Sequence, residues 1–163
     1  MKKLVLFTIL LFGFSLVLMA QSVTGATGSL QPSLLSKLRQ FATNTGRNLN
    51  VRSGGRDMSE QAQLWDAGLA RGGHISSDHA AAVRNGSDCN ITTTGGNAVH
   101  APRISGIGWM EIARPGRSRH ETGEAADVDG IGWNDCAELN RVGLRHTVSS
   151  EPWHIEEGTW CNH

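Results

Sequence analysis

The sequence predicts one domain that combines helices with short strands. Removal of an apolar leader would leave about 140 residues, which is enough chain for a single hydrophobic core. Between Ser33 and Thr45 apolar residues recur at the spacing of one helical face. Over Asn48–Arg52 apolar and polar residues alternate, as they do in a half-buried strand. Because no repeat or linker divides the chain, we expect one compact unit.

The first 26 residues have the pattern of a secretory signal peptide. Lys2 and Lys3 precede an almost unbroken apolar run over Leu4–Met19, and small residues follow it. We expect cleavage after Ala20 or after Ala26, with residues 27–163 as the functional domain. The alternative is an uncleaved anchor helix, since the run is close to the lower limit for spanning a bilayer. We therefore predict a secreted, periplasmic or cell-envelope protein that contacts a membrane only if this segment is not removed.

The first predicted helix covers Ser33–Thr45. Pro32 near its start and Gly46 after its end are typical of helix termini. The apolar stripe on its predicted core face consists of Leu34, Leu35, Leu38, Phe41 and Ala42.

After the strand at Asn48–Arg52, the segment 53–56 predicts a turn, and a second helix is expected from Ser59 to about Gly68. We expect Ser59 as its N-cap and Leu64 and Trp65 as its buried face.

The second half of the chain has fewer regular patterns. From Arg71 to Met110 glycine and polar residues dominate, which predicts a long loop region around a cleft. Residues Trp133–Leu144 predict a short helix, and Thr147–Ser149 and His154–Glu156 predict strands.

Two stretches carry the residues of one predicted metal site. His120 and Asp127 lie on either side of a glycine-containing bend, and His154 ends an extended segment that begins at Glu151. Two imidazoles and one carboxylate suit zinc and leave a fourth position for water. Glu151 is expected beside the metal but not bound to it, where a carboxylate can accept a proton from an activated water. Glu156 is the alternative base, because residues two apart on a strand face the same side.

These residues resemble the zinc D-alanyl-D-alanine carboxypeptidases and related peptidoglycan peptidases of the VanY type. The family pattern Ser-x-His-x-x-Gly-x-Ala-x-Asp, followed later by Glu-x-Trp-His, is complete and in order here. The resemblance implies that the two imidazoles and the carboxylate hold Zn²⁺ and that the free glutamate is the general base. The matching residues are Ser118, His120, Gly123, Ala125, Asp127, Glu151, Trp153 and His154.

A third segment also resembles the family, whose Ser-Gly-Tyr-Arg sequence contributes an arginine to the substrate site. Here Ser53, Gly54 and Arg56 match, and Gly55 replaces the aromatic residue. The resemblance therefore implies that Arg56 acts in catalysis and substrate binding, with Ser118 also at the substrate. The alternative for Arg56 is an ordinary surface salt bridge.

The fold that the resemblance implies is α+β, a small antiparallel sheet with helices packed on one side, in a single domain like that of the hedgehog signalling domain. The implied function is zinc-dependent hydrolysis of peptidoglycan stem peptides by a D,D-carboxypeptidase or a related endopeptidase, acting as a monomer. The alternatives are an exported zinc-binding domain without catalysis and a peptidase of other peptides. The formal net charge of +0 gives no reason to expect a nucleic-acid partner.

The three cysteines lack the spacing of zinc ligands, and in an exported chain they are candidates for a disulfide. We favour a bond between Cys136 and Cys161, because Cys161 closes the tail just after the last predicted strand. A bond between Cys89 and Cys161 is the alternative.

Overall fold

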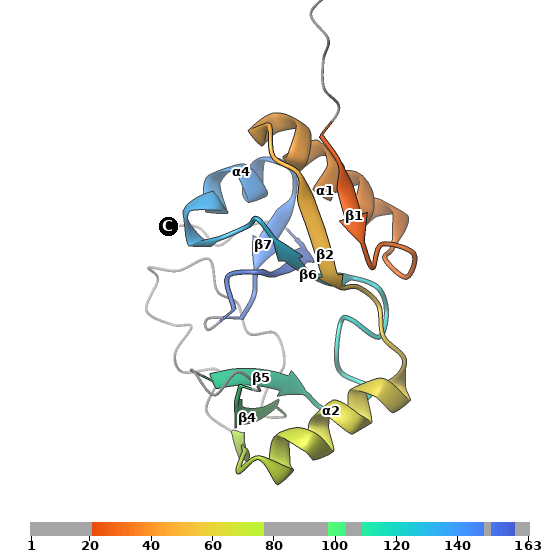
Figure 1. Ribbon diagram of the computed structural model, residues 1–163, viewed down its shortest axis with the longest axis vertical. Coiled ribbons are helices and arrows are strands. Elements are labelled where there is room, and N and C mark those ends of the chain that lie inside the picture. Colours follow the sequence, from red (N-terminus) through yellow and green to blue (C-terminus); the bar gives the residue numbers. More distant parts are fainter. Residues whose placement is uncertain (1–20, 77–97, 104–108, 149–150, 159–163) are drawn as a thin grey trace, which may run out of the picture.

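The computed structural model describes residues 21–76, 98–103, 109–148 and 151–158, and these form an α+β fold with two sheets (Figure 1). The larger sheet has five strands in the order β1-β2-β6-β8-β7, and the smaller has three in the order β3-β4-β5. The predicted α+β class is confirmed. The smaller sheet was not predicted from the sequence, and it forms one wall of the functional cleft.

The larger sheet is mixed and not wholly antiparallel as expected. Its strands are β1 (Val23–Gly25), β2 (Leu49–Ser53), β6 (Ala125–Asp129), β8 (His154–Glu157) and β7 (Leu144–His146). β1 runs parallel to β2, and the other neighbours are antiparallel.

The prediction of a strand at Thr147–Ser149 is wrong for the residues that the structure describes there. The chain reverses at Gly143, whose φ of 75° is readily adopted by glycine, and pairing with β8 therefore begins at Leu144. β7 ends at His146, so Thr147 and Val148 lie outside the strand.

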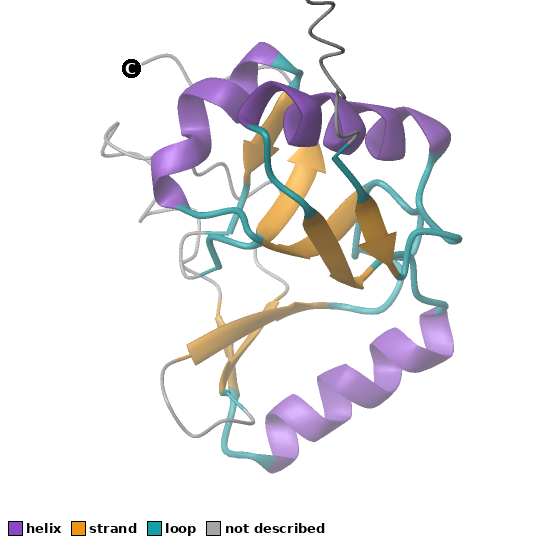
Figure 2. Cartoon of the chain, turned by 45° about the horizontal axis from the view of Figure 1, so that its top comes forward, coloured by secondary structure: helices purple, strands orange, loops and turns teal. Residues whose placement is uncertain are grey.

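Two helices cover one face of the larger sheet (Figure 2). α1 (Pro32–Thr45) ends at Gly46, which is left-handed with a φ of 68°, and α4 (Cys136–Arg141) follows a short 3-10 turn. Both helices were predicted. The core between them and the sheet is formed by fully buried side chains, among them Leu34, Leu38, Phe41, Leu49, Val51, Val128, Leu139, Leu144 and Ile155.

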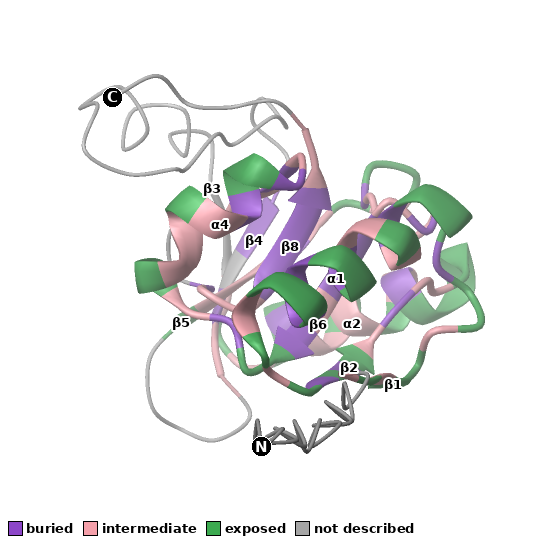
Figure 3. Ribbon diagram, turned by 90° about the horizontal axis from the view of Figure 1, so that it is seen from above, coloured by how far each residue is buried: buried purple, intermediate pink, exposed green. Residues whose placement is uncertain are grey.

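Along β6 and β8, side chains point alternately into this core and to the opposite face of the sheet, here called the functional face. Ala126, Val128 and Ile155 belong to the core under the helices. Because successive strand residues point to opposite faces, Asp127 and His154 lie on the other side of the sheet. β6 and β8 are buried in the middle of the molecule, while the outer faces of the helices are exposed (Figure 3).

A second layer faces this side of the sheet. It consists of α2 (Met58–Ala70), β3 (His74–Ser76), β4 (Ala98–Pro102) and β5 (Trp109–Ala113). Its small core is formed by Val99, Ala101 and Ile112, with the predicted helix residues Leu64 and Trp65 packed against it. The long loop predicted for residues 71–110 is therefore wrong where these strands are described, because short strands gain their stability from pairing and carry little periodic signal.

The start of α2 also differs from the prediction. Asp57 is its N-cap, not Ser59, and accepts a hydrogen bond from the Glu60 backbone N–H at 2.8 Å. The Glu60 carboxylate in turn accepts from the Asp57 N–H at 3.0 Å, which completes a capping box.

The predicted leader lies mostly in residues 1–20, outside the described residues. Cleavage after Ala20 would keep β1, whereas cleavage after Ala26 would remove it together with its pairing to β2. Within the described part of the chain, no helix has the length and apolar character needed to cross a membrane.

Candidate metal centre

Three segments bring the predicted metal ligands together. Asp127 on β6 and His154 on β8 are direct partners in the antiparallel register, so their side chains lie side by side on the functional face. His120 comes from the turn that precedes β6. One ligand atom from each residue can be chosen so that all three lie within 4.8 Å of one another. Among the described residues this is the one group of histidine, cysteine and carboxylate side chains that could hold a metal ion.

The distances between the three predicted ligands show which of their atoms face one another. His154 Nδ1 lies 3.1 Å from Asp127 Oδ1 and 3.3 Å from His120 Nε2. The distance from His120 Nε2 to Asp127 Oδ1 is 3.6 Å. Two imidazole nitrogens and one carboxylate oxygen thus converge on one point, and this donor set fits zinc.

The orientation of His120 is fixed by a hydrogen bond on the side of its ring that faces away from the metal centre. Its Nδ1 lies 2.7 Å from the carbonyl oxygen of Gly54, so Nδ1–H donates to the backbone and Nε2 keeps its lone pair for the centre. The Arg56 backbone N–H donates to the His120 carbonyl at 3.0 Å. The segment that carries Arg56 and the turn that carries His120 therefore hold each other in place.

The electrostatics of His120 and Asp127 suit these two residues to bind a cation. Burial lowers the pKa of His120, and the hydrogen bond with Asp127 offsets only part of this effect. Burial alone would raise the pKa of Asp127, but its hydrogen bonds with His120 and His154 dominate and hold that pKa far below its ordinary value. A divalent cation at the centre would therefore meet an ionised carboxylate.

Glu151 lies in the same cleft as the three ligands and is only 7% exposed. Its Oε1 accepts a hydrogen bond from the Glu111 backbone N–H of β5 at 3.2 Å. Burial raises the pKa of Glu151 above its ordinary value. A buried carboxylate with a raised pKa is better suited to take up a proton than one in water. The contribution of β5 to this residue could not be predicted, because the strand itself was not.

Arg56 also lines the cleft, and its guanidinium is held in place by three neighbours. It donates to Ser53 Oγ at 2.8 Å and to Gln61 Oε1 at 3.2 Å, and it lies 3.9 Å from Asp127 Oδ2. Gln61 is 1% exposed and donates to the Ala113 carbonyl at 2.6 Å. These contacts are not those of an exposed surface pair.

Ser118 is buried and lines the cleft close to the turn that carries His120. Its backbone N–H donates to the Glu121 carboxylate at 2.9 Å.

Of the predicted disulfide, only Cys136 is described. Cys161 and Cys89 lie outside the described residues, so the pairing stays a prediction.

Gly55, which stands where the family pattern has an aromatic residue, packs against the loop formed by residues 26–31. A Cβ at Gly55 would lie 2.5 Å from the Ser29 carbonyl oxygen, which is too close for any side chain. A Cβ at Gly123 would lie equally close to the same oxygen. Ser29 Oγ donates to the Gly55 carbonyl, and the Gln31 N–H donates to the Gly123 carbonyl. In this chain the loop 26–31 therefore occupies the space beside both glycines.

Comparison with known families identifies the family of this chain. The sequence model of the VanY D-alanyl-D-alanine carboxypeptidase family matches residues 31–143, well over half of the chain. The chain belongs to this family. The matched range includes Arg56, Ser118, His120 and Asp127, and it ends before Glu151 and His154.

Among solved structures, the chain is similar to the vancomycin-resistance D,D-pentapeptidase VanY of a VanB-type cassette, a mutant in complex with Zn(II). The identity is 22% and the TM-score is 0.42, over 78% of this chain and 72% of that one. No curated protein matches the chain. The family membership confirms the predicted enzyme class, a zinc-dependent D-alanyl-D-alanine carboxypeptidase-type hydrolase of peptidoglycan peptides.

Proposed function

We propose that this VanY-family enzyme removes the terminal D-alanine from peptidoglycan stem peptides, with zinc held by His120, Asp127 and His154. The observation that carries the proposal is the convergence of His120 Nε2, Asp127 Oδ1 and His154 Nδ1 beside a buried carboxylate, Glu151, in one cleft. Zinc bound there would act as a Lewis acid toward a water and toward the scissile carbonyl.

Glu151 is the proposed general base. Its carboxylate takes a proton from the attacking water and returns it to the leaving amine. The Glu111 N–H holds one of its oxygens, which keeps the carboxylate aimed into the cleft. Burial removes competing solvent and raises its pKa, and both effects favour proton uptake during the reaction.

Arg56 is the proposed substrate anchor. Because Ser53 and Gln61 fix its guanidinium, little side-chain freedom is lost when a substrate oxygen binds. A planar guanidinium suits a carboxylate or the oxygen of a polarised peptide carbonyl. Ser118, which is buried and lines the same cleft, is the proposed second contact to the substrate.

This activity belongs at the cell envelope, where peptidoglycan peptides occur. Export by the leader at residues 1–26 stays part of the proposal, because that segment lies almost wholly outside the described residues.

Digestion of purified muropeptides tests the function. We expect a pentapeptide ending in D-alanyl-D-alanine to lose one alanine, as measured by mass spectrometry, and we expect the loss to stop after chelation and to resume when zinc is added. Two internal fragments would instead indicate a related endopeptidase. An unchanged substrate in the presence of bound zinc would favour a binding domain without catalysis.

A further inference from the structure

Glu156 is a buried carboxylate next to the metal centre to which the mechanism assigns no role. It lies two residues after His154 on β8, so both side chains point to the functional face. It is 5% exposed. A carboxylate this deeply buried is unfavourable unless charged or polar partners compensate for the lost water. Its direct partner on β6 is Ala125, which has a small side chain, and its direct partner on β7 is Arg145.

The contacts of Glu156 lead to the proposed ligand His154. Glu156 Oε1 lies 3.3 Å from His154 Nε2, and on the other side of the ring His154 Nδ1 lies 3.1 Å from Asp127 Oδ1. The two ring nitrogens point away from each other. Donation of Nε2–H to Glu156 therefore leaves the Nδ1 lone pair directed at the metal centre.

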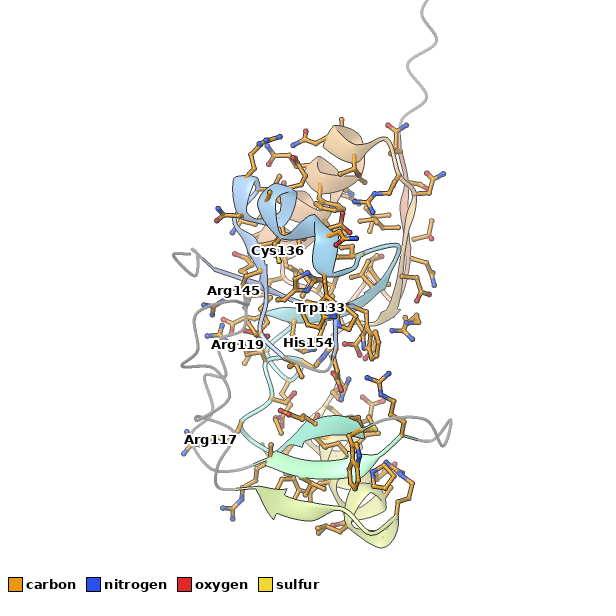
Figure 4. The ribbon with its side chains drawn as sticks, turned by 90° about the vertical axis from the view of Figure 1, so that its left-hand side faces the viewer. Arg117, Arg119, Trp133, Cys136, Arg145 and His154 are labelled. Carbon is orange, nitrogen blue, oxygen red and sulfur yellow. The ribbon has the colours of Figure 1, made fainter. Side chains whose placement is uncertain are left out.

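Two arginines hold Glu156 from its other side. Arg119 Nε lies 3.2 Å from Glu156 Oε2, and Arg145 Nη2 lies 3.9 Å from the same oxygen. Both arginines are labelled together with His154 in Figure 4. Arg119 precedes His120 in the same turn, and Arg145 belongs to the neighbouring strand β7. The carboxylate thus lies between the ring of His154 and two guanidinium groups, with which its Oε2 forms ion pairs but no hydrogen bond. This position leaves it poorly placed to act as the alternative base.

We propose that Glu156 is a positioning residue for the metal: its carboxylate accepts Nε2–H of His154, fixes the ring tautomer, and presents Nδ1 to zinc. Carboxylates that accept the outer N–H of a ligating histidine orient the ring and make it a stronger ligand. The inference rests on the proposed zinc ligation by His154. Arg119 and Arg145 act through Glu156 by compensating its buried charge.

Zinc affinity measured by competition with a chromogenic chelator tests the proposal without any assay of hydrolysis. Glu156→Ala is expected to bind zinc about 10- to 100-fold more weakly than the wild type. Glu156→Gln should recover part of the loss, because its amide oxygen can still accept Nε2–H. The matched control is Glu157→Ala, the next residue on the strand, whose carboxylate pairs with Lys37 at 2.7 Å and does not line the cleft. This control should bind zinc as the wild type does.

A second measurement keeps the proposal testable if Glu156→Ala does not fold. In the zinc-bound wild type, nitrogen NMR of the His154 ring should show a protonated Nε2 and a metal-bound Nδ1. A proton on Nδ1, or an unchanged zinc affinity in a folded Glu156→Ala, would overturn the proposal. Wild-type protein that binds zinc through His154 but hydrolyses no muropeptide would contradict the proposed function alone.

Discussion

Glu151→Gln is expected to lower the rate of D-alanine release by roughly two to four orders of magnitude while zinc content stays unchanged. Glutamine keeps the size of the side chain and can still accept the Glu111 N–H, but it cannot take a proton from water. Since Glu151 lies outside the proposed ligand set, the metal should remain bound. The rate on a purified muropeptide and the zinc content by elemental analysis are measured on the same sample.

Two further variants make this result specific. Glu157→Gln, which alters a carboxylate paired with Lys37 outside the cleft, should hydrolyse at the wild-type rate. Glu156→Gln should retain more activity than Glu151→Gln, because its expected effect is on the metal and not on proton transfer. If Glu151→Gln cleaves as fast as the wild type with zinc bound, Glu151 is not the base.

His154→Ala is expected to lose both activity and metal, from about one zinc per chain to almost none. The substitution removes the ring that links Asp127 to Glu156 and leaves only two proposed ligands, fewer than zinc sites in proteins provide. Elemental analysis after dialysis against a weak chelator measures the loss.

The control for this variant is His146→Ala on the adjacent strand β7. His146 is fully buried, and its Nε2 donates to the Gly132 carbonyl at 3.1 Å, outside the cleft. Its removal should lower the melting temperature but leave zinc bound. Full zinc loading of His154→Ala would show that His154 is not a ligand.

The sequence predicted the elements whose own residues carry a strong pattern. The apolar stripe from Leu34 to Ala42 was sufficient for α1, because one helical face must be buried. The strands β3, β4 and β5 were missed, since they gain their stability from pairing with one another and their own residues carry no clear alternation. The N-cap of α2 was placed two residues late, because Asp57 forms a capping box with Glu60 that the choice of Ser59 overlooked.

The candidate site was predictable as a set of residue types but not as an arrangement. The motifs named His120, Asp127 and His154, whereas their convergence depends on the register that pairs Asp127 with His154. Gly55 could be recognised only as a departure from the family pattern. A glycine is needed at this position because a Cβ would clash with the Ser29 carbonyl, which belongs to a loop 26 residues earlier in the chain.

The central claim is that one zinc ion is held by two histidines and one aspartate on the cleft side of the sheet. Crystals of the zinc-loaded protein, measured on both sides of the zinc absorption edge, test it directly. We predict a single anomalous peak at about 2.0–2.2 Å from His120 Nε2, Asp127 Oδ1 and His154 Nδ1. A peak bonded to other residues, or to Nε2 of His154, would contradict the account.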